Sequence, residues 1–258
     1  MKKFILLYFI IYVFSYANYL ITNSEIVLFY SENNKSIEYI RGDIFNNISI
    51  SNLDFKLILD NKKILSLNDK IKEVNIIKDT NILELTYKIN ENEIKIIVLP
   101  SMNQKGKLYF LVDLSKFYIE REKVDFVIEV VPQYDNRFID IKNGIATYDN
   151  FSFRSENYEG NLYLARNSQI EDFTLEKIKK RTKKYENDKI YFIINNIFKE
   201  KNIIFDFNFY NNFSLAKSSE NLESILEKEF NYWNIEKKTE RIKGNLLKIG
   251  RASCRERV

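Results

Sequence analysis

Residues 83–99 read LELTYKINENEIKIIVL, and this stretch decides the fold class. Apolar and polar side chains alternate from Leu83 to Ile89, a turn signal follows at Asn90-Glu91-Asn92, and a second apolar run returns over residues 94–99. Alternation with a period of two is what a half-buried strand requires, because successive side chains point to opposite faces of a sheet. The stretch therefore predicts an antiparallel β-hairpin.

The same pattern recurs from Asn18 to about Asn212. Polar turns separate short runs of β-branched and aromatic residues, which favour strands. Asn143-Gly144 is the clearest turn, because both central positions of a two-residue hairpin turn need positive φ. The expected strands include residues 26–30, 37–40, 55–59, 64–67, 83–89, 94–99, 138–142, 145–148, 148–153, 161–165, 190–194 and 203–209. So many short strands predict a mainly β fold, a large antiparallel two-sheet β-sandwich.

Two segments depart from this pattern. Residues 175–184, LEKIKKRTKK, predict a short helix whose basic cluster is either a patch for anionic surfaces or, more simply, a solvated face. Ser219 is a candidate N-cap for a C-terminal amphipathic linker helix. Its apolar stripe consists of Leu222, Ile225, Leu226, Phe230 and Trp233. The stripe packs either on the sandwich or on a following domain, and we expect helix 219–239 to pack on a missing helical domain.

The first seventeen residues have the layout of a secretory signal peptide. Two lysines precede an apolar run over residues 4–14, and small residues at Ser15 and Ala17 suit cleavage after Ala17. A membrane anchor is the alternative, but the run is shorter than the ~20 residues that a spanning helix needs. We therefore expect a secreted or periplasmic protein with no membrane span after signal cleavage.

The last ten residues, IGRASCRERV, differ in composition from the Ile-, Asn- and Lys-rich chain before them. The string resembles a translated sequencing adapter, with a genuine basic tail as the alternative. On this interpretation Cys254 is not native, and the natural protein continues past Lys248. The expected domains are a signal peptide over 1–17, a β-sandwich over 18–216, a linker helix leading to a missing helical domain over 217–248, and a non-native tail over 249–258.

Composition excludes several chemistries. The 258 residues contain no His and one Cys, so a Ser-His-Asp or Cys-His triad, a histidine-ligated zinc and an internal disulfide are excluded. The formal net charge of +4 comes from the two ends, because residues 1–17 contribute two positive charges and residues 249–258 contribute two more. A neutral stretch over 18–248 gives no reason to expect a nucleic-acid partner.

Carboxylates are the remaining candidates for chemistry, since paired Asp and Glu residues hydrolyse glycosides without His or metal. Most of them fall in expected turns or at alternate strand positions, which is typical of solvated surfaces: Asp60, Glu84, Glu91, Asp135 and Asp206. We therefore expect no catalytic, cofactor-binding or metal-ligating residue, and no cofactor, in this chain.

Two aromatic groups allow two interpretations each. Phe205, Phe207 and Phe209 alternate along one expected strand, either as a platform for sugar stacking or, more simply, as core residues. Tyr232 and Trp233 allow the same choice, and packing between domains is the simpler one.

Two stretches are similar to a known family. They are LEKEFNYWNIEKKT at 226–239 and VVPQYDNRF at 130–138, the first in the linker helix and the second in the expected sandwich. Together with the order of signal peptide, sandwich and helix, they resemble the N-terminal part of bacterial glucoamylase-type enzymes, family 15 of the glycoside hydrolases. The resemblance spans nearly all of residues 18–248, but it rests on packing and linker residues.

The resemblance implies a function for the parent protein. In that family an (α/α)6 barrel follows the sandwich and supplies two glutamates, a general acid and a general base, for inverting hydrolysis of an α-1,4-glucan or related α-glucoside. None of those positions falls in this chain. The resemblance thus implies a truncated, non-catalytic sandwich domain of an exported hydrolase, whose carbohydrate partner binds through the missing barrel. The alternatives are an exported non-enzymatic β-sandwich module that binds carbohydrate or a surface partner, and a self-contained exported β protein.

Overall fold

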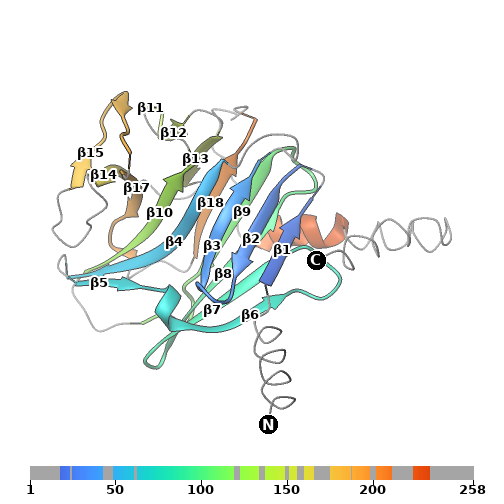
Figure 1. Ribbon diagram of the computed structural model, residues 1–258. Helices are drawn as coiled ribbons and strands as arrows, with labels where there is room; N and C mark the ends of the chain where they lie inside the picture. Colours follow the sequence, from blue (N-terminus) through green and yellow to red (C-terminus); the bar gives the residue numbers. More distant parts are fainter. Residues whose placement is uncertain are drawn as a thin grey trace, which may run out of the picture.

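The computed structural model describes residues 18–23, 25–42, 49–60, 63–118, 123–133, 137–148, 151–155, 160–165, 175–186, 188–197, 202–210 and 223–232 (Figure 1). The signal peptide expected over 1–17, the tail over 249–258, Asp135 and Trp233 lie outside the described residues.

Two antiparallel sheets lie face to face (Figure 1), and the described residues give each sheet nine strands. Sheet A has the order β1-β2-β3-β4-β10-β17-β14-β15, with β5 also paired to β4. Its strands are β1 (Asn18–Thr22), β2 (Val27–Ser31), β3 (Ser36–Arg41), β4 (Ile50–Leu59), β5 (Lys63–Ser66), β10 (Val124–Pro132), β14 (Asn161–Ala165), β15 (Leu175–Lys177) and β17 (Lys189–Ile194). The expected two-sheet antiparallel sandwich is confirmed.

Sheet B has the order β16-β11-β12-β13-β18-β9-β8-β7-β6. Its strands are β6 (Ile71–Ile76), β7 (Leu83–Ile89), β8 (Asn92–Pro100), β9 (Lys107–Asp113), β11 (Phe138–Lys142), β12 (Ile145–Tyr148), β13 (Phe151–Ser155), β16 (Thr182–Lys183) and β18 (Asn202–Asn208), and a 3₁₀ turn, η1 (Asn68–Lys70), precedes β6.

The core between the sheets is rich in aromatic rings. Phe207 is packed against Phe153 and Phe110, with ring centroids 5.2 and 5.3 Å apart. Phe205 meets Phe192 edge-on at 5.6 Å, so the core connects β18 of sheet B to β17 of sheet A. Aromatic pairs at these separations stabilise a core beyond their buried area by ~0.5–1.5 kcal/mol each. The core interpretation of Phe205, Phe207 and Phe209 is therefore confirmed, since all three belong to this buried cluster.

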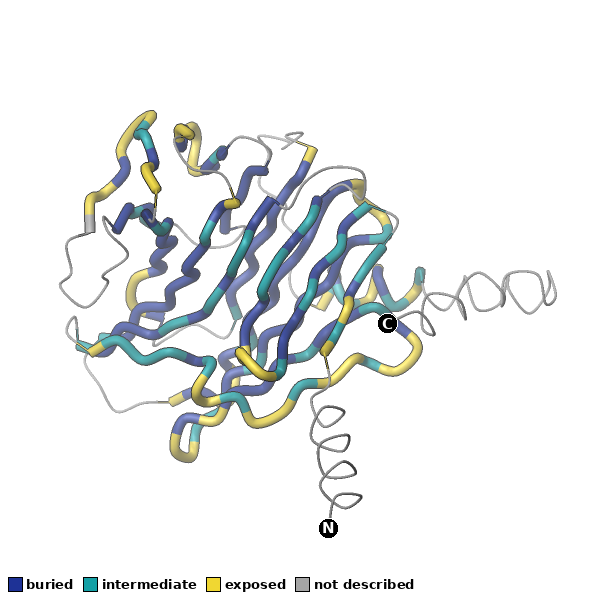
Figure 2. Tube along the Cα trace, in the orientation of Figure 1, coloured by how far each residue is buried: buried dark blue, intermediate teal, exposed yellow. Residues whose placement is uncertain are grey.

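The predicted hairpins form where turn chemistry and alternation agree. Residues 83–89 and 94–99 pair as β7 and β8, and Asn90 between them has φ of 56°. Asn143 and Gly144, with φ of 52° and 76°, join β11 to β12 as an Asn-Gly turn requires. Figure 2 shows the result as dark, buried strands whose exposed residues gather at the turns and at the outer edges.

The prediction of a helix over residues 175–184 is wrong. Residues 175–177 form β15 at the edge of sheet A, and residues 182–183 form β16 at the edge of sheet B. Ile178 lies between them, is buried, and donates its N–H to Leu162 O at 2.8 Å. Pairing with β14 and β11 supplies backbone hydrogen bonds that override the helical preference of the Lys-rich sequence.

Residues 223–232 form a helix, part of the one expected over 219–239. Ile225, Leu226 and Phe230 pack on the outer face of sheet B, against a cluster that includes Leu99, Leu111 and Ile204. Ile225 is buried on the protein's own sandwich, whereas Leu226 and Phe230 are only partly buried there. The expectation that the stripe packs on a missing domain therefore stays a prediction. Figure 1 shows this helix beside the sandwich, near the end of the described chain.

Candidate functional site

Two networks of buried charged side chains lie one on the outer face of each sheet. On sheet A, Glu129 of β10 has an exposed side-chain fraction of 1%. Its carboxylate accepts a hydrogen bond from Tyr191 Oη at 2.6 Å and one from Lys189 Nζ at 2.7 Å, and it pairs with Lys56. Burial raises the pKa of Glu129, but the two lysines and the tyrosine outweigh burial and hold this pKa below its ordinary value.

Asp54 lies directly across from Glu129 in the register of β4 and β10. Burial, and secondarily the charge of Glu129, raise the pKa of Asp54, although Asn68 Nδ2 donates to its Oδ1 at 2.8 Å. Two neighbouring carboxylates whose pKa values move in opposite directions are the pattern of an acid and a base. Glu129 is nevertheless covered by its own partners, whereas Asp54 is partly exposed.

On sheet B, Asp206 of β18 is fully buried. Lys107 Nζ lies 3.0 Å from its Oδ2, and Arg154 Nε lies 3.4 Å from its Oδ1. Burial lowers the pKa of Lys107, but the charge of Asp206 and the contact with Tyr109 together outweigh burial and raise this pKa above its ordinary value. The expectation that Asp206 lies on a solvated sheet face is wrong, because the outer face of sheet B is covered at this point.

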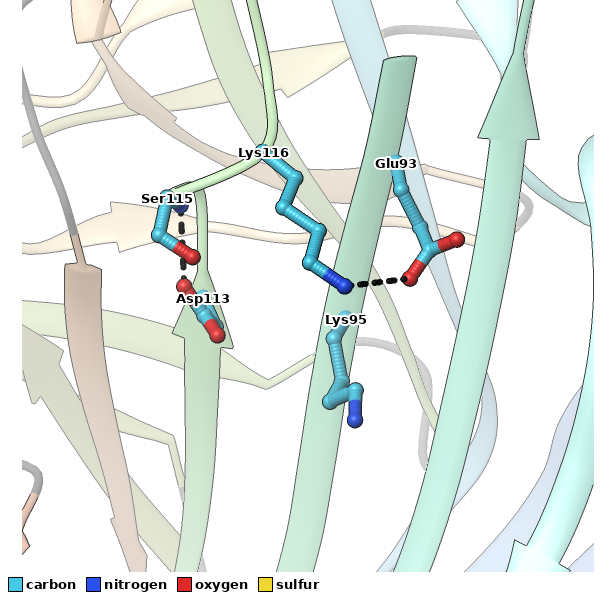
Figure 3. Close-up of a pocket in the computed structure, with 5 residues that line it drawn as sticks. All are labelled: Glu93, Lys95, Asp113, Ser115 and Lys116. Atoms are coloured by element: carbon cyan, nitrogen blue, oxygen red, sulfur yellow. Dashed lines mark hydrogen bonds and ion pairs between the residues drawn. The ribbon is translucent and has the colours of Figure 1, made fainter. Parts of the chain in front are cut away.

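A shallow hollow opens at the other end of sheet B (Figure 3). It is lined by Glu93, Lys95, Asp113, Ser115 and Lys116. Lys116 Nζ lies 3.8 Å from Glu93 Oε1, and Ser115 N donates to Asp113 Oδ1 at 2.9 Å (Figure 3). A hydrogen bond from Lys72 is the main reason that the pKa of Glu93 is lowered. The hollow is polar and open, without the apolar walls that bury a ligand.

The other carboxylates singled out in the sequence lie apart from one another. Asp60, with φ of 51°, follows β4, and Glu91 lies in the turn between β7 and β8. Glu84 pairs with Lys95 at 3.1 Å and its side chain is 21% exposed. Glu91 is exposed as expected, whereas Asp60 and Glu84 are partly buried. The expectation of no catalytic residue is not tested by these positions.

The helix of residues 223–232 is fixed to sheet B by one buried carboxylate. Glu229 Oε1 accepts from Ser101 Oγ at 2.7 Å and from Asn103 Nδ2 at 3.3 Å, while Oε2 accepts from Met102 N at 3.1 Å. Ser101 Oγ in turn accepts from Gln104 N at 3.1 Å, which orders the turn after β8. Sequence reasoning found the apolar stripe of this helix but missed Glu229, because nothing in the pattern marks one buried Glu among several exposed ones.

These arrangements stabilise the fold and position the helix. Among the described residues, no group of three or more His, Cys, Asp or Glu could hold a metal ion. In the same part of the chain, no helix is both long and apolar enough to cross a membrane.

Comparison with known proteins shows likeness in fold. No protein-family model and no curated protein matches the sequence. A bacterial glucoamylase, solved in complex with acarbose, superposes with a TM-score of 0.62 at 10% identity, over 81% of this chain and 35% of that enzyme. A family GH92 inverting mannosidase from Bacteroides thetaiotaomicron aligns at 12% identity over 77% of this chain and 28% of its own, with a TM-score of 0.43, too loose to bear on the fold.

The protein therefore has a β-sandwich of the kind found in part of a glycoside hydrolase. The chain spans about a third of the glucoamylase that it matches. At this identity the likeness extends to the fold alone.

Proposed function

We propose that this chain is a non-catalytic sandwich domain of an exported α-glucan or α-glucoside hydrolase. The observation that carries the proposal is the superposition on a glucoamylase over 81% of this chain, which accounts for only 35% of that enzyme. A domain of this size leaves room in such an enzyme for a separate catalytic domain. The 226–239 and 130–138 stretches, which resemble family 15, support the same assignment.

The charge arrangement supports the non-catalytic part of the proposal. Inverting glycosidases hold two carboxyl groups ~6.5–9.5 Å apart with room for a water and a sugar between them. Glu129 and Asp206, the most buried of the described carboxylates, are instead packed against lysines, an arginine and a tyrosine. Their geometry suits a scaffold that holds its shape.

A two-part experiment tests this function. The purified 258-residue chain should release no sugar from amylose or from 4-nitrophenyl α-glucoside. The parent protein, whose sequence is read from the source genome past Lys248, should hydrolyse both substrates. Proton NMR should show that the anomeric configuration of the product is inverted. Several hundred further residues with paired helical hairpins would agree. Hydrolysis by the 258-residue chain alone, or a parent that acts on neither substrate, would overturn the proposal.

A second function has an observation in its favour. An exported non-enzymatic module that binds carbohydrate or a surface partner needs exposed contact groups, and the β11–β16 edge of sheet B presents Phe138 and Tyr185 with exposed fractions of 43% and 51%. An early natural stop codon after Lys248 would favour this module over the hydrolase.

A further inference from the structure

One edge of the sandwich concentrates positive charge. Residues 175–186, which pass from β15 at the edge of sheet A to β16 at the edge of sheet B, contain six Lys or Arg and two Glu. We call residues 175–186 the crossover. Residues 18–248 have no net charge as a whole, so the positive charge of the crossover is balanced by acidic residues elsewhere in that stretch. Figure 2 shows exposed residues along this end of the molecule.

The crossover is held in place at both ends, so its cations have defined positions. Ile178 is 3% exposed and is hydrogen-bonded to Leu162 O, while Lys184 is 1% exposed and donates its N–H to Arg137 O at 2.8 Å. Between these two anchors, Lys179, Lys180 and Arg181 are exposed. A solvated charge run on a loose loop would lack such anchors.

Two aromatic rings, those of Phe138 and Tyr185, lie among these cations. Phe138 pairs with Lys183 across β11 and β16, so their side chains share one face of the sheet. The Arg181 guanidinium lies 4.1 Å from the centroid of the Phe138 ring, and Lys183 Nζ lies 5.2 Å from that of Tyr185. Arg181 also lies 3.8 Å from Asp140, at 64% side-chain exposure. The rings hold the cations near the surface without burying them.

We propose that this edge, defined by Phe138, Arg181, Lys183 and Tyr185, binds a carboxylated polysaccharide. Arg and Lys pair with carboxylates, Arg in a fork that suits their two oxygens. The flat apolar faces of Phe and Tyr pack against the C–H face of a pyranose ring. A polyanion without sugar rings along its surface would contact only the Lys and Arg side chains, and a neutral glucan would contact only the aromatic rings. An acidic glycan contacts both kinds of side chain, so the edge selects it.

The binding site does not depend on the proposed hydrolase role, and its test needs no activity. Polygalacturonate is titrated into the purified 258-residue chain by isothermal calorimetry at two salt concentrations, with amylose and double-stranded DNA as comparison ligands. Polygalacturonate should bind most tightly and more weakly at higher salt, because exposed charge pairs are screened. The variant Arg181→Ala/Lys183→Ala should weaken binding roughly tenfold, as for the loss of two charge contacts.

Matched variants separate charge from ring contacts. Phe138→Ala/Tyr185→Ala should weaken polygalacturonate binding while leaving its salt dependence unchanged. The control for charge is Lys70→Ala/Lys78→Ala, which removes two exposed lysines next to β6, at the opposite edge of sheet B. The control for the rings is Tyr118→Ala, which removes an aromatic residue that is 66% exposed. Neither control should change the affinity for polygalacturonate. No binding, equal binding of DNA or amylose, or an equal loss in the Lys70/Lys78 variant would each overturn the proposal.

Discussion

The carboxylate of Glu229 accepts a hydrogen bond of 2.7 Å from Ser101 Oγ, although 128 positions separate the two residues in the chain. This contact joins the helix of residues 223–232 to the turn that follows β8. The same turn is bound on its other side, because Asn23 Nδ2 donates to Ser101 O at 2.9 Å and Gly106 N donates to Glu25 Oε2 at 2.7 Å. The turn over residues 101–106 therefore links the beginning of the sandwich, its middle and the helix.

Replacing Glu229 by Ala should destabilise the protein by ~1–3 kcal/mol, because Ser101 Oγ and the Met102 N–H lose a buried charged acceptor. Urea unfolding measures this loss, and hydrogen exchange at Met102 should accelerate. Glu227→Ala, on the exposed face of the same helix, is the control and should change the free energy of unfolding by ~0.5 kcal/mol or less. Equal effects of the two variants would contradict the assigned role of Glu229.

Replacing Glu129 by Gln should lower stability at neutral pH and flatten its dependence on acid. The folded-state pKa of Glu129 lies below its ordinary value of 4.5, so its contribution is present above pH 4.5 and is lost as the pH falls through the folded pKa. We expect a loss of ~1–3 kcal/mol at pH 7 that shrinks in acid, measured by urea unfolding from pH 7 to pH 3. Glu73→Gln, at an exposed position of β6, should leave the wild-type pH profile unchanged.

Replacing Asp54 by Asn should have the opposite sign. Asp54 faces the buried charge of Glu129, and like charges directly across a sheet are destabilising by ~0.2–1 kcal/mol. Asn keeps the oxygen that accepts from Asn68, so the variant should gain up to ~1 kcal/mol at pH 7. The gain should fade as the pH falls through the raised pKa of Asp54, where the wild-type side chain takes up its own proton. A loss of stability at neutral pH would show that Asp54 is favourably paired.

Gly106 and Gly144 form a matched pair for a steric test. Both have positive φ, 65° and 76°, so Ala at either position incurs the left-handed cost of ~1–2 kcal/mol. A Cβ at Gly106 would also overlap the ring of Tyr210, whereas nothing lies within 4 Å of one at Gly144. Gly106→Ala should therefore lower the melting temperature more than Gly144→Ala does. Adding Tyr210→Ala to Gly106→Ala should restore part of the lost melting temperature. If it restores none, the extra destabilisation of Gly106→Ala comes from the backbone and not from the Tyr210 ring.

Local sequence patterns predicted the hairpins and the central strand β18, but missed two other inner strands. Alternation and turn residues were sufficient for β7–β8 and β11–β12, because both partners and the turn lie within twenty residues. The central strands β9 and β10 were not among the expected strands; their residues are buried along almost the whole length, and alternation disappears when both faces are covered. Pairing of β10 with β17 joins residues sixty or more positions apart and leaves no local signal.

The charged residues show the same limit. Asp206 occupies an alternate strand position that is typical of a solvated face, but it is buried with Lys107 and Arg154, which come from the neighbouring strands β9 and β13. The Lys-rich run at 175–184 was predicted to be a helix because its residues favour one, whereas edge pairing with β11 and β14 fixes it as strands. Both errors have one cause, since burial and pairing depend on segments far away in the sequence.

The position of β18 has a consequence for biosynthesis. This strand, residues 202–208, lies between β13 and β9 in sheet B, so both neighbours are made earlier than the strand that separates them. On a ribosome, where the N-terminal part emerges first, β9 and β13 must wait with unpaired backbone groups until β18 appears. The nascent chain is thus exposed to aggregation in this interval, when chaperones would protect it.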